Sequence, residues 1–216
     1  MGGVSLKEWK ANVNFAVKIA ASKVNDVAIG GLSTGGTLSF YTAVNNNKVS
    51  RALYLFSAAL DLAGGIVGDL KEFILRLKPL VEILDKNKPL IGANPYRYAG
   101  MDLDGARELS KLILETDTII KRFNPKEPFS KRIFAAHSES DSSANIKGIE
   151  DLEKVSDPNK FKFFCIPKAK EVSHASLVLK DPIYAPGTSG GDEPLEKANP
   201  QFNEMMKAIA DFEKII

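Results

Sequence analysis

A glycine-rich turn around one serine limits the fold of this chain more than any other feature. Residues 30–36 read Gly-Gly-Leu-Ser-Thr-Gly-Gly and directly follow the apolar run 27–29. A G-x-S-x-G turn between a strand and a helix holds its serine in a strained conformation and lifts the hydroxyl away from the sheet. We expect glycine to be required at Gly31 and Gly35, where a side chain would collide with the neighbouring chain. The pattern predicts an exposed, reactive Ser33, and an ordinary glycine-rich turn is the alternative.

The rest of the chain alternates between strand-like and helix-like segments. The predicted strands cover residues 24–30, 51–59, 132–136 and 161–166. The first two lack polar alternation, which is typical of parallel strands buried on both faces. The predicted helices cover residues 6–20, 35–44, 144–152 and 200–212. This order predicts a single α/β domain over residues 1–216, with a mostly parallel sheet flanked by helices.

The two terminal helices carry recognisable start signals. Ser5 and Glu8 have the spacing of a capping box, and an apolar stripe with helical period follows them. Near the other end, Asn199 precedes Pro200, which is typical of a helix cap followed by the first helical residue. We therefore expect both helices to bury one apolar face against the sheet.

One long segment departs from the alternation of strands and helices. Residues 62–125 contain two helical patterns, at 66–84 and 102–123, and no predicted strand. Such an insertion is expected either to form a helical cap over an active site or to pad the sheet, and the residues favour neither reading.

Composition excludes several classes of function. Hydrophobic residues make up 44% of the chain and charged residues 26%, as in ordinary globular proteins. With 29 basic and 27 acidic residues, no charge excess points to nucleic acid or to an anionic membrane. No apolar run is long enough for a transmembrane segment. The single cysteine, Cys165, is expected as buried filler in its strand, and without a secretory signal it indicates a cytoplasmic protein.

Three residues able to form a catalytic triad occur in the order Ser, Asp, His, each after a predicted strand. Ser33 follows the first predicted strand, Asp141 follows the third, and His174 follows the fourth. With the motifs VAIGGLSTGGTL, NPYRYAGMDLDGARELSKLI, FAAHSESDSSAN and EVSHASLVL, this order resembles that of the α/β-hydrolases. The most similar branch is that of monoacylglycerol lipases, lysophospholipases and carboxylesterases.

The resemblance implies a serine hydrolase that acts on a small ester or a lipid-like substrate. Ser33 would be the nucleophile, His174 the general base and Asp141 the acid that orients the histidine. The backbone N–H of Thr34 would be one donor of the oxyanion hole. Neither a metal nor an organic cofactor is expected.

Other residues near these positions have alternative interpretations. Glu139 lies two positions before Asp141 and is the alternative acid. His137, the other histidine, ends its predicted strand and is expected to be a hydrogen-bonded core or rim residue. The segment 30–37 approaches a phosphate-binding loop, but Gly36 stands where the lysine is required.

The sequence also departs from the resemblance at its start. In the family several strands precede the strand before the nucleophile, whereas only one helix precedes residue 24 here. The resemblance therefore implies an N-terminally truncated fold without the second oxyanion donor, a loss of about 3 kcal/mol in catalysis. A bare edge on the strand at 24–30 would invite a second copy or a partner chain. Two functions stay open: an active carboxylic ester hydrolase, and an impaired fragment acting as a remnant or assembly partner.

Overall fold

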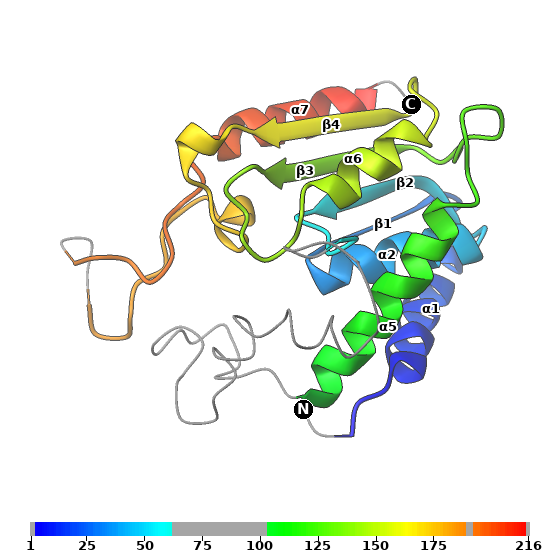
Figure 1. The fold of residues 1–216 in the computed structure, drawn as a ribbon, viewed down its shortest axis with the longest axis horizontal. Coiled ribbons are helices and arrows are strands. Elements are labelled where there is room, and N and C mark those ends of the chain that lie inside the picture. The colour runs from blue at the N-terminus through cyan, green and yellow to red at the C-terminus, as the bar shows by residue number, and fades with distance from the viewer. Residues whose placement is uncertain (1–2, 62–102, 189–191, 215–216) are drawn as a thin grey trace.

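The computed structural model describes residues 3–61, 103–188 and 192–214 (Figure 1). The helix predicted over residues 66–84 lies outside these ranges. Within them, no helix is long and apolar enough to cross a membrane.

The centre of the fold is a four-stranded sheet whose strands lie side by side in chain order, and all neighbours are parallel. Its strands are β1 (Val27–Leu32), β2 (Val49–Phe56), β3 (Ile133–Ser138) and β4 (Phe161–Ile166). The predicted α/β class with a parallel sheet is thus confirmed. The predicted bounds match for β4 and differ at the ends of the other three strands.

Five helices of the described residues surround the sheet, with two short 3₁₀ turns after β4. The helices are α1 (Leu6–Ala21), α2 (Thr34–Asn45), α5 (Leu103–Ile120), α6 (Lys147–Lys154) and α7 (Phe202–Lys214). The turns are η1 (Lys168–Lys170) and η2 (Ser176–Val178). In Figure 1, α7 lies beyond β4, whereas α1, α2 and α5 lie together at the other side of the sheet.

Both faces of the sheet are covered, because successive strand side chains point to opposite faces. On one face, Ile133 of β3 packs with side chains from α2, α5 and α6, including Phe40, Ile120 and Leu152. On the other face, Phe134 packs with Phe212 of α7, and other members of this cluster are Leu177 and Met205. Burial on both faces explains why β3 has no exposed residue.

The capping box at the start of α1 is confirmed. Ser5 Oγ accepts a hydrogen bond from the Glu8 N–H at 3.3 Å, and Glu8 Oε2 accepts one from the Ser5 N–H at 3.0 Å. The helix buries less than its apolar stripe predicts, because only Leu6 and Val17 are fully buried and Ala16 is exposed. Phe15 on the same helix is 66% exposed.

The last helix begins later than predicted. Pro200 lies in a turn, and α7 starts at Phe202. Asn199 still acts as an acceptor, because its Oδ1 binds the N–H of Gln201 at 2.8 Å. The prediction of Pro200 as the first helical residue is therefore wrong by two residues.

The segment predicted as an insertion contributes to the core. The helical pattern at 102–123 forms α5, whose residues Ile119 and Ile120 pack in the same cluster as Phe40 of α2. This end of the segment therefore packs against the sheet. The predicted cap over residues 62–125 stays a prediction, because residues 62–102 lie outside the described part.

Because the strands are parallel, the loops that follow them start at the same end of the sheet. The arrowheads of β2, β3 and β4 point to the same side in Figure 1, where the loops after β3 and β4 gather. Within the described residues, β1 pairs with β2 and has no strand on its other side. At the opposite edge of the sheet, Cys165 of β4 is exposed, so the prediction of a buried filler residue is wrong.

Close approaches of neighbouring chain require glycine at three positions around Ser33. A Cβ on Gly30 would lie 2.7 Å from the Cβ of Tyr54. A Cβ on Gly31 would lie 2.4 Å from the backbone carbon of Gly35, and a Cβ on Gly36 would lie 2.7 Å from the Cβ of Ala58. A Cβ on Gly35 itself would meet nothing within 4 Å. The expectation for Gly31 therefore agrees with the structure, whereas the expectation for Gly35 is wrong, because the tight position in the first turn of α2 is Gly36.

We expect Gly31→Ala to destabilise the fold and Gly35→Ala not to. The Gly31 variant must displace backbone, at a cost of about 1–3 kcal/mol. The Gly35 variant replaces a helical glycine in open space and should be neutral or stabilising by about 0.5–1 kcal/mol. Urea unfolding of both variants measures the difference. Equal stability of the two variants would contradict the close approach at Gly31.

Candidate active site

Ser33 is held in an unusual backbone conformation between β1 and α2. Its φ is 55° and its ψ is −124°. Its N–H donates to the carbonyl of Phe56 at 3.0 Å, and its carbonyl accepts from the N–H groups of Thr37 and Ala59 at 3.1 and 3.3 Å. A positive φ at a non-glycine residue costs on the order of 1–3 kcal/mol and persists only when its surroundings fix it. Here the end of β2 and the first turn of α2 do so.

Thr34 is the first residue of α2. The first N–H groups of a helix have no acceptor within that helix, and the helix dipole adds partial positive charge at the same end. The backbone next to Ser33 is therefore suited to stabilise negative charge that develops on a neighbouring oxygen.

Asp141 lies in the loop after β3 with its side chain fully buried. Its Oδ1 accepts hydrogen bonds from the N–H groups of Ser143 and Ala144 at 2.8 and 3.0 Å. These two bonds fold the loop around the carboxylate and leave Oδ2 free to bind another donor.

That donor is His174. The distance from His174 Nδ1 to Asp141 Oδ2 is 2.7 Å, and the His174 side chain is 21% exposed. Because a carboxylate only accepts, Nδ1 carries the proton and Nε2 is left as the accessible basic atom. Burial raises the pKa of Asp141, but the hydrogen bond and charge of His174 and the N–H groups of the loop outweigh it and lower the pKa below its ordinary value.

The loop that carries His174 is tethered by residues that sequence analysis missed. Glu196 Oε2 accepts hydrogen bonds from the hydroxyls of Ser173 and Ser176 at 3.4 and 3.3 Å. Asn199 Nδ2 donates to the carbonyl of Leu177 at 2.7 Å. Glu196 lies in a polar stretch without a motif, so no sequence signal indicated this role, and Asn199 was expected only as a helix cap.

The competing acid has a different contact. Glu139 Oε2 accepts the N–H of Lys168 at 2.8 Å and so ties the loop after β3 to η1. The structure thus brings Asp141, and not Glu139, to His174. The other histidine, His137, is completely buried, and its Nε2 lies 3.1 Å from the carbonyl of Ala144. This agrees with the expectation of a hydrogen-bonded core residue.

Ser33 lies at the end of β1 on the same edge of the sheet as the other two residues. Among the hydrogen bonds between described residues, none joins Ser33 Oγ to His174. Catalytic hydrogen bonds are often long without substrate and tighten when it binds. A second strained residue that sequence analysis missed is Ser57, which follows β2 with a φ of 41° and donates its N–H to Ala136.

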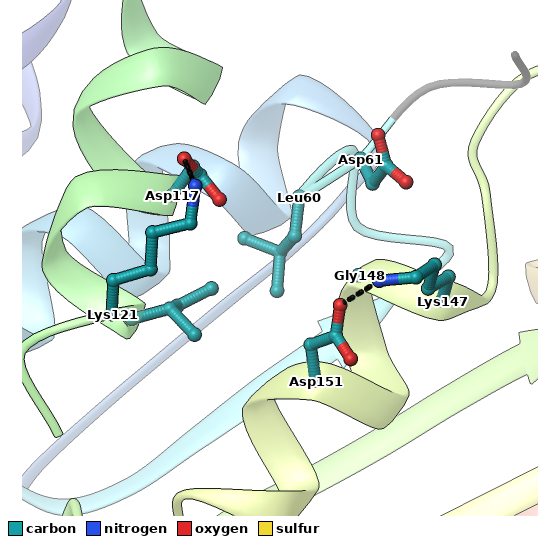
Figure 2. A pocket seen from close by; sticks show the side chains of 8 residues that line it. Leu60, Asp61, Asp117, Lys121, Lys147, Gly148 and Asp151 are labelled. Carbon is teal, nitrogen blue, oxygen red and sulfur yellow. Dashed lines mark hydrogen bonds and ion pairs between the residues drawn. The ribbon is translucent and has the colours of Figure 1, made fainter. Parts of the chain in front are cut away.

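The described residues contain no group of three or more side chains placed to hold a metal ion. A separate pocket of about 170 Å³ lies beside α5 and α6 (Figure 2). Lys121 pairs with Asp117 on one helix and Lys147 with Asp151 on the other. These four charges are thus paired with near neighbours in the chain, and the pocket belongs to the packing between α5 and α6.

The buried ionisable groups predict acid sensitivity. Burial lowers the pKa of His137 below its ordinary value of 6.5, although the nearby charges of Asp141 and Glu150 act in the opposite direction. In both Asp141 and His137 the folded pKa is depressed, so the unfolded chain takes up protons first as the pH falls. The stabilisation by a neutral His137 should therefore be complete above pH 6.5 and decrease below it, and that by the charged Asp141 should decrease below pH 3.8.

We expect the urea concentration at the unfolding midpoint to decrease when the pH is lowered from about 7 to about 5. The decrease should be smaller in His137→Gln, which lacks the titrating ring. Circular dichroism at a series of pH values measures both proteins. A wild-type midpoint that stays constant over this range would show that His137 is not kept neutral by burial.

Comparison with known proteins gives a clear result for structure alone. No family model matches the sequence, and none of the curated proteins matches it either. A monoacylglycerol lipase from Paleococcus ferrophilus is similar in structure with a TM-score of 0.62 and 12% identity, covering 98% of this chain and 76% of the lipase.

Two further solved structures agree with this result. A soluble variant of monoglyceride lipase from Saccharomyces cerevisiae has a TM-score of 0.60 at 14% identity, over 97% of this chain and 68% of that one. A thermophilic esterase from Thermogutta terrifontis has a TM-score of 0.58 at 14% identity, over 99% of this chain and 74% of the esterase. With the parallel sheet and its flanking helices, these likenesses show that the chain has the α/β-hydrolase fold of lipases and esterases.

Proposed function

We propose that this protein is a serine hydrolase of carboxylic esters, with Ser33 as nucleophile, His174 as general base and Asp141 as the acid that orients it. The observation that carries the proposal is the buried Asp141 carboxylate bound to His174 Nδ1 at 2.7 Å. This contact leaves His174 Nε2 to accept a proton at the end of the sheet where Ser33 follows β1. The proposal treats the strained turn at Ser33 as a nucleophile elbow.

The reaction begins with a proton transfer. As Ser33 Oγ attacks the ester carbonyl carbon, its proton moves to His174 Nε2, and the carbonyl oxygen takes up the negative charge. Asp141 stabilises the imidazolium that forms. The carbon–oxygen bond to the alcohol then breaks, the alcohol takes the proton from His174, and an acyl-enzyme on Ser33 remains. Water then attacks the acyl-enzyme and gives a proton to His174. The carboxylic acid leaves as Ser33 takes that proton back.

The negative oxygen of the intermediate needs hydrogen-bond donors. The Thr34 N–H at the start of α2 is the donor that we assign, supported by the partial positive charge of the helix end. A small ester or a monoglyceride-like lipid is the proposed substrate class. The monoacylglycerol and monoglyceride lipases among the structural neighbours support this choice.

Turnover of a panel of p-nitrophenyl and monoglyceride esters tests the proposal. Ser33→Ala and His174→Ala should abolish the activity, and Asp141→Asn should lower kcat by about 10⁴-fold, because the amide favours the wrong tautomer of His174. Glu139→Gln is the matched control: it changes a carboxylate two residues away that binds Lys168, and it should keep the activity. Equal losses in Glu139→Gln and Asp141→Asn, or turnover that survives in Ser33→Ala, would contradict the assignment.

A second candidate function is that of an assembly partner with impaired catalysis. It is favoured by β1, which has a strand on one side only within the described residues. Next to it, α1 packs against β1 and presents Phe15 and Ile19, which are 66% and 44% exposed. Unpaired strand edges beside apolar surface favour pairing with another chain.

On this second reading, the chain should self-associate as its concentration rises. Light scattering after size-exclusion chromatography measures its mass. The double variant Phe15→Lys with Ile19→Lys should stay monomeric, because two charges would be buried in the contact. Met206→Lys is the control, since Met206 is similarly exposed, at 45%, but lies on α7. A wild-type chain that is monomeric throughout argues against association at this surface.

A further inference from the structure

The ring of His137 lies directly beside the carboxylate of Asp141. Its Nε2 is 3.6 Å from Asp141 Oδ2, and both side chains are completely buried. The same Nε2 is 3.1 Å from the carbonyl oxygen of Ala144. The other ring nitrogen, Nδ1, is buried without a hydrogen-bond partner. The ester hydrolysis described above assigns no role to this imidazole.

These contacts determine where the proton of His137 resides. A backbone carbonyl can only accept a hydrogen bond, so Nε2 must carry the proton and Nδ1 must be bare. Burial lowers the pKa of His137 and keeps the ring neutral. The ionisable groups whose charges act on it are Asp141, His174 and Glu150. The positive end of a neutral N–H dipole therefore faces the space between Ala144 and Asp141.

The hydrogen bonds form a continuous connection from this ring to His174. His137 Nε2–H donates to the Ala144 carbonyl, and the Ala144 N–H donates to Asp141 Oδ1 at 3.0 Å. Asp141 Oδ2 then accepts from His174 Nδ1 at 2.7 Å. Movement of residue 144 would shift the carboxylate, and with it the ring of His174.

We propose that His137 is a positioning residue, which fixes the 141–144 turn through Ala144 and aligns the Asp141 carboxylate with His174. It touches no substrate and acts only through Asp141. The alignment itself follows from the contacts of the folded chain, whereas its effect on catalysis rests on the proposed ester hydrolysis.

The role requires a hydrogen-bond donor at this position. In His137→Leu the buried Ala144 carbonyl loses its donor, and the N–H dipole next to Asp141 disappears. In His137→Gln the side-chain amide can donate in place of Nε2. Thr116→Val is the matched control, because Thr116 is also completely buried, and its hydroxyl donates to the carbonyl of Ile113 within the same helix, α5.

The first readout is ¹⁵N NMR of the imidazole rings, which is well suited to a chain with two histidines. His174→Ala assigns the signals. In the wild type, His137 should show the Nε2–H tautomer and His174 the Nδ1–H tautomer. His174 should become a mixture of tautomers in His137→Leu and stay as in the wild type in His137→Gln and Thr116→Val. A wild-type His137 in the Nδ1–H tautomer overturns the proposal even if His137→Leu fails to fold.

The second readout is steady-state kinetics. His137→Leu should lower kcat on the order of tenfold to a hundredfold with little change in KM, because the displaced base acts on the bound substrate. His137→Gln should recover most of the rate. Unchanged tautomer and kcat in His137→Leu, or a loss in His137→Gln as large as in His137→Leu, overturns the proposal.

These readouts separate this proposal from the proposed function. If the wild type hydrolyses no ester but His174 loses its tautomer in His137→Leu, the ester hydrolase proposal fails and the alignment by His137 stands. If the wild type hydrolyses esters and His137→Leu matches it in both readouts, the ester hydrolase proposal stands and the positioning role of His137 fails.

Discussion

The in-register parallel pairing of β3 with β4 is the constraint on which the candidate site depends. Ser138 pairs with Ile166, so the two strands end side by side, and the loops that follow them start from neighbouring points. Only this alignment lets Asp141 and His174, which are far apart in sequence, meet at 2.7 Å. A shift of β4 by one residue against β3 would exchange the two faces of β4 and remove Phe163 and Ile166 from the clusters in which they pack. Packing on both faces thus fixes the register, and the register fixes the site.

The site also contains features that oppose folding. Ser33 has a positive φ, and the Asp141 carboxylate is removed from water. Each is offset locally: Ser33 is bound by Phe56, Thr37 and Ala59, and Asp141 by two backbone N–H groups and His174. Strain and buried charge that are compensated in this way, at one edge of a sheet, are typical of reactive centres.

Much of this arrangement could be predicted from local sequence patterns. The apolar run at 161–166, the capping box at Ser5 and the glycines around Ser33 each act within a few residues, and the structure has a strand, a cap and a tight turn there. The errors concern contacts between distant segments. Cys165 is exposed because β4 lies at the edge of the sheet, and Gly36 is tight because Ala58 follows the neighbouring strand. The tether of the His174 loop by Glu196 has no local signal at all.

Ser33 is the proposed nucleophile, and covalent labelling of its hydroxyl distinguishes an activated serine from an inert one. Folded protein is treated with a fluorophosphonate, and its intact mass gives the number of adducts per chain. Proteolysis and peptide mapping then locate the labelled residue. We predict one adduct per chain on Ser33, absent in Ser33→Ala and formed much more slowly in His174→Ala, because His174 Nε2 must accept the proton of Ser33. Folded protein without an adduct, or with an adduct on another residue, would contradict it.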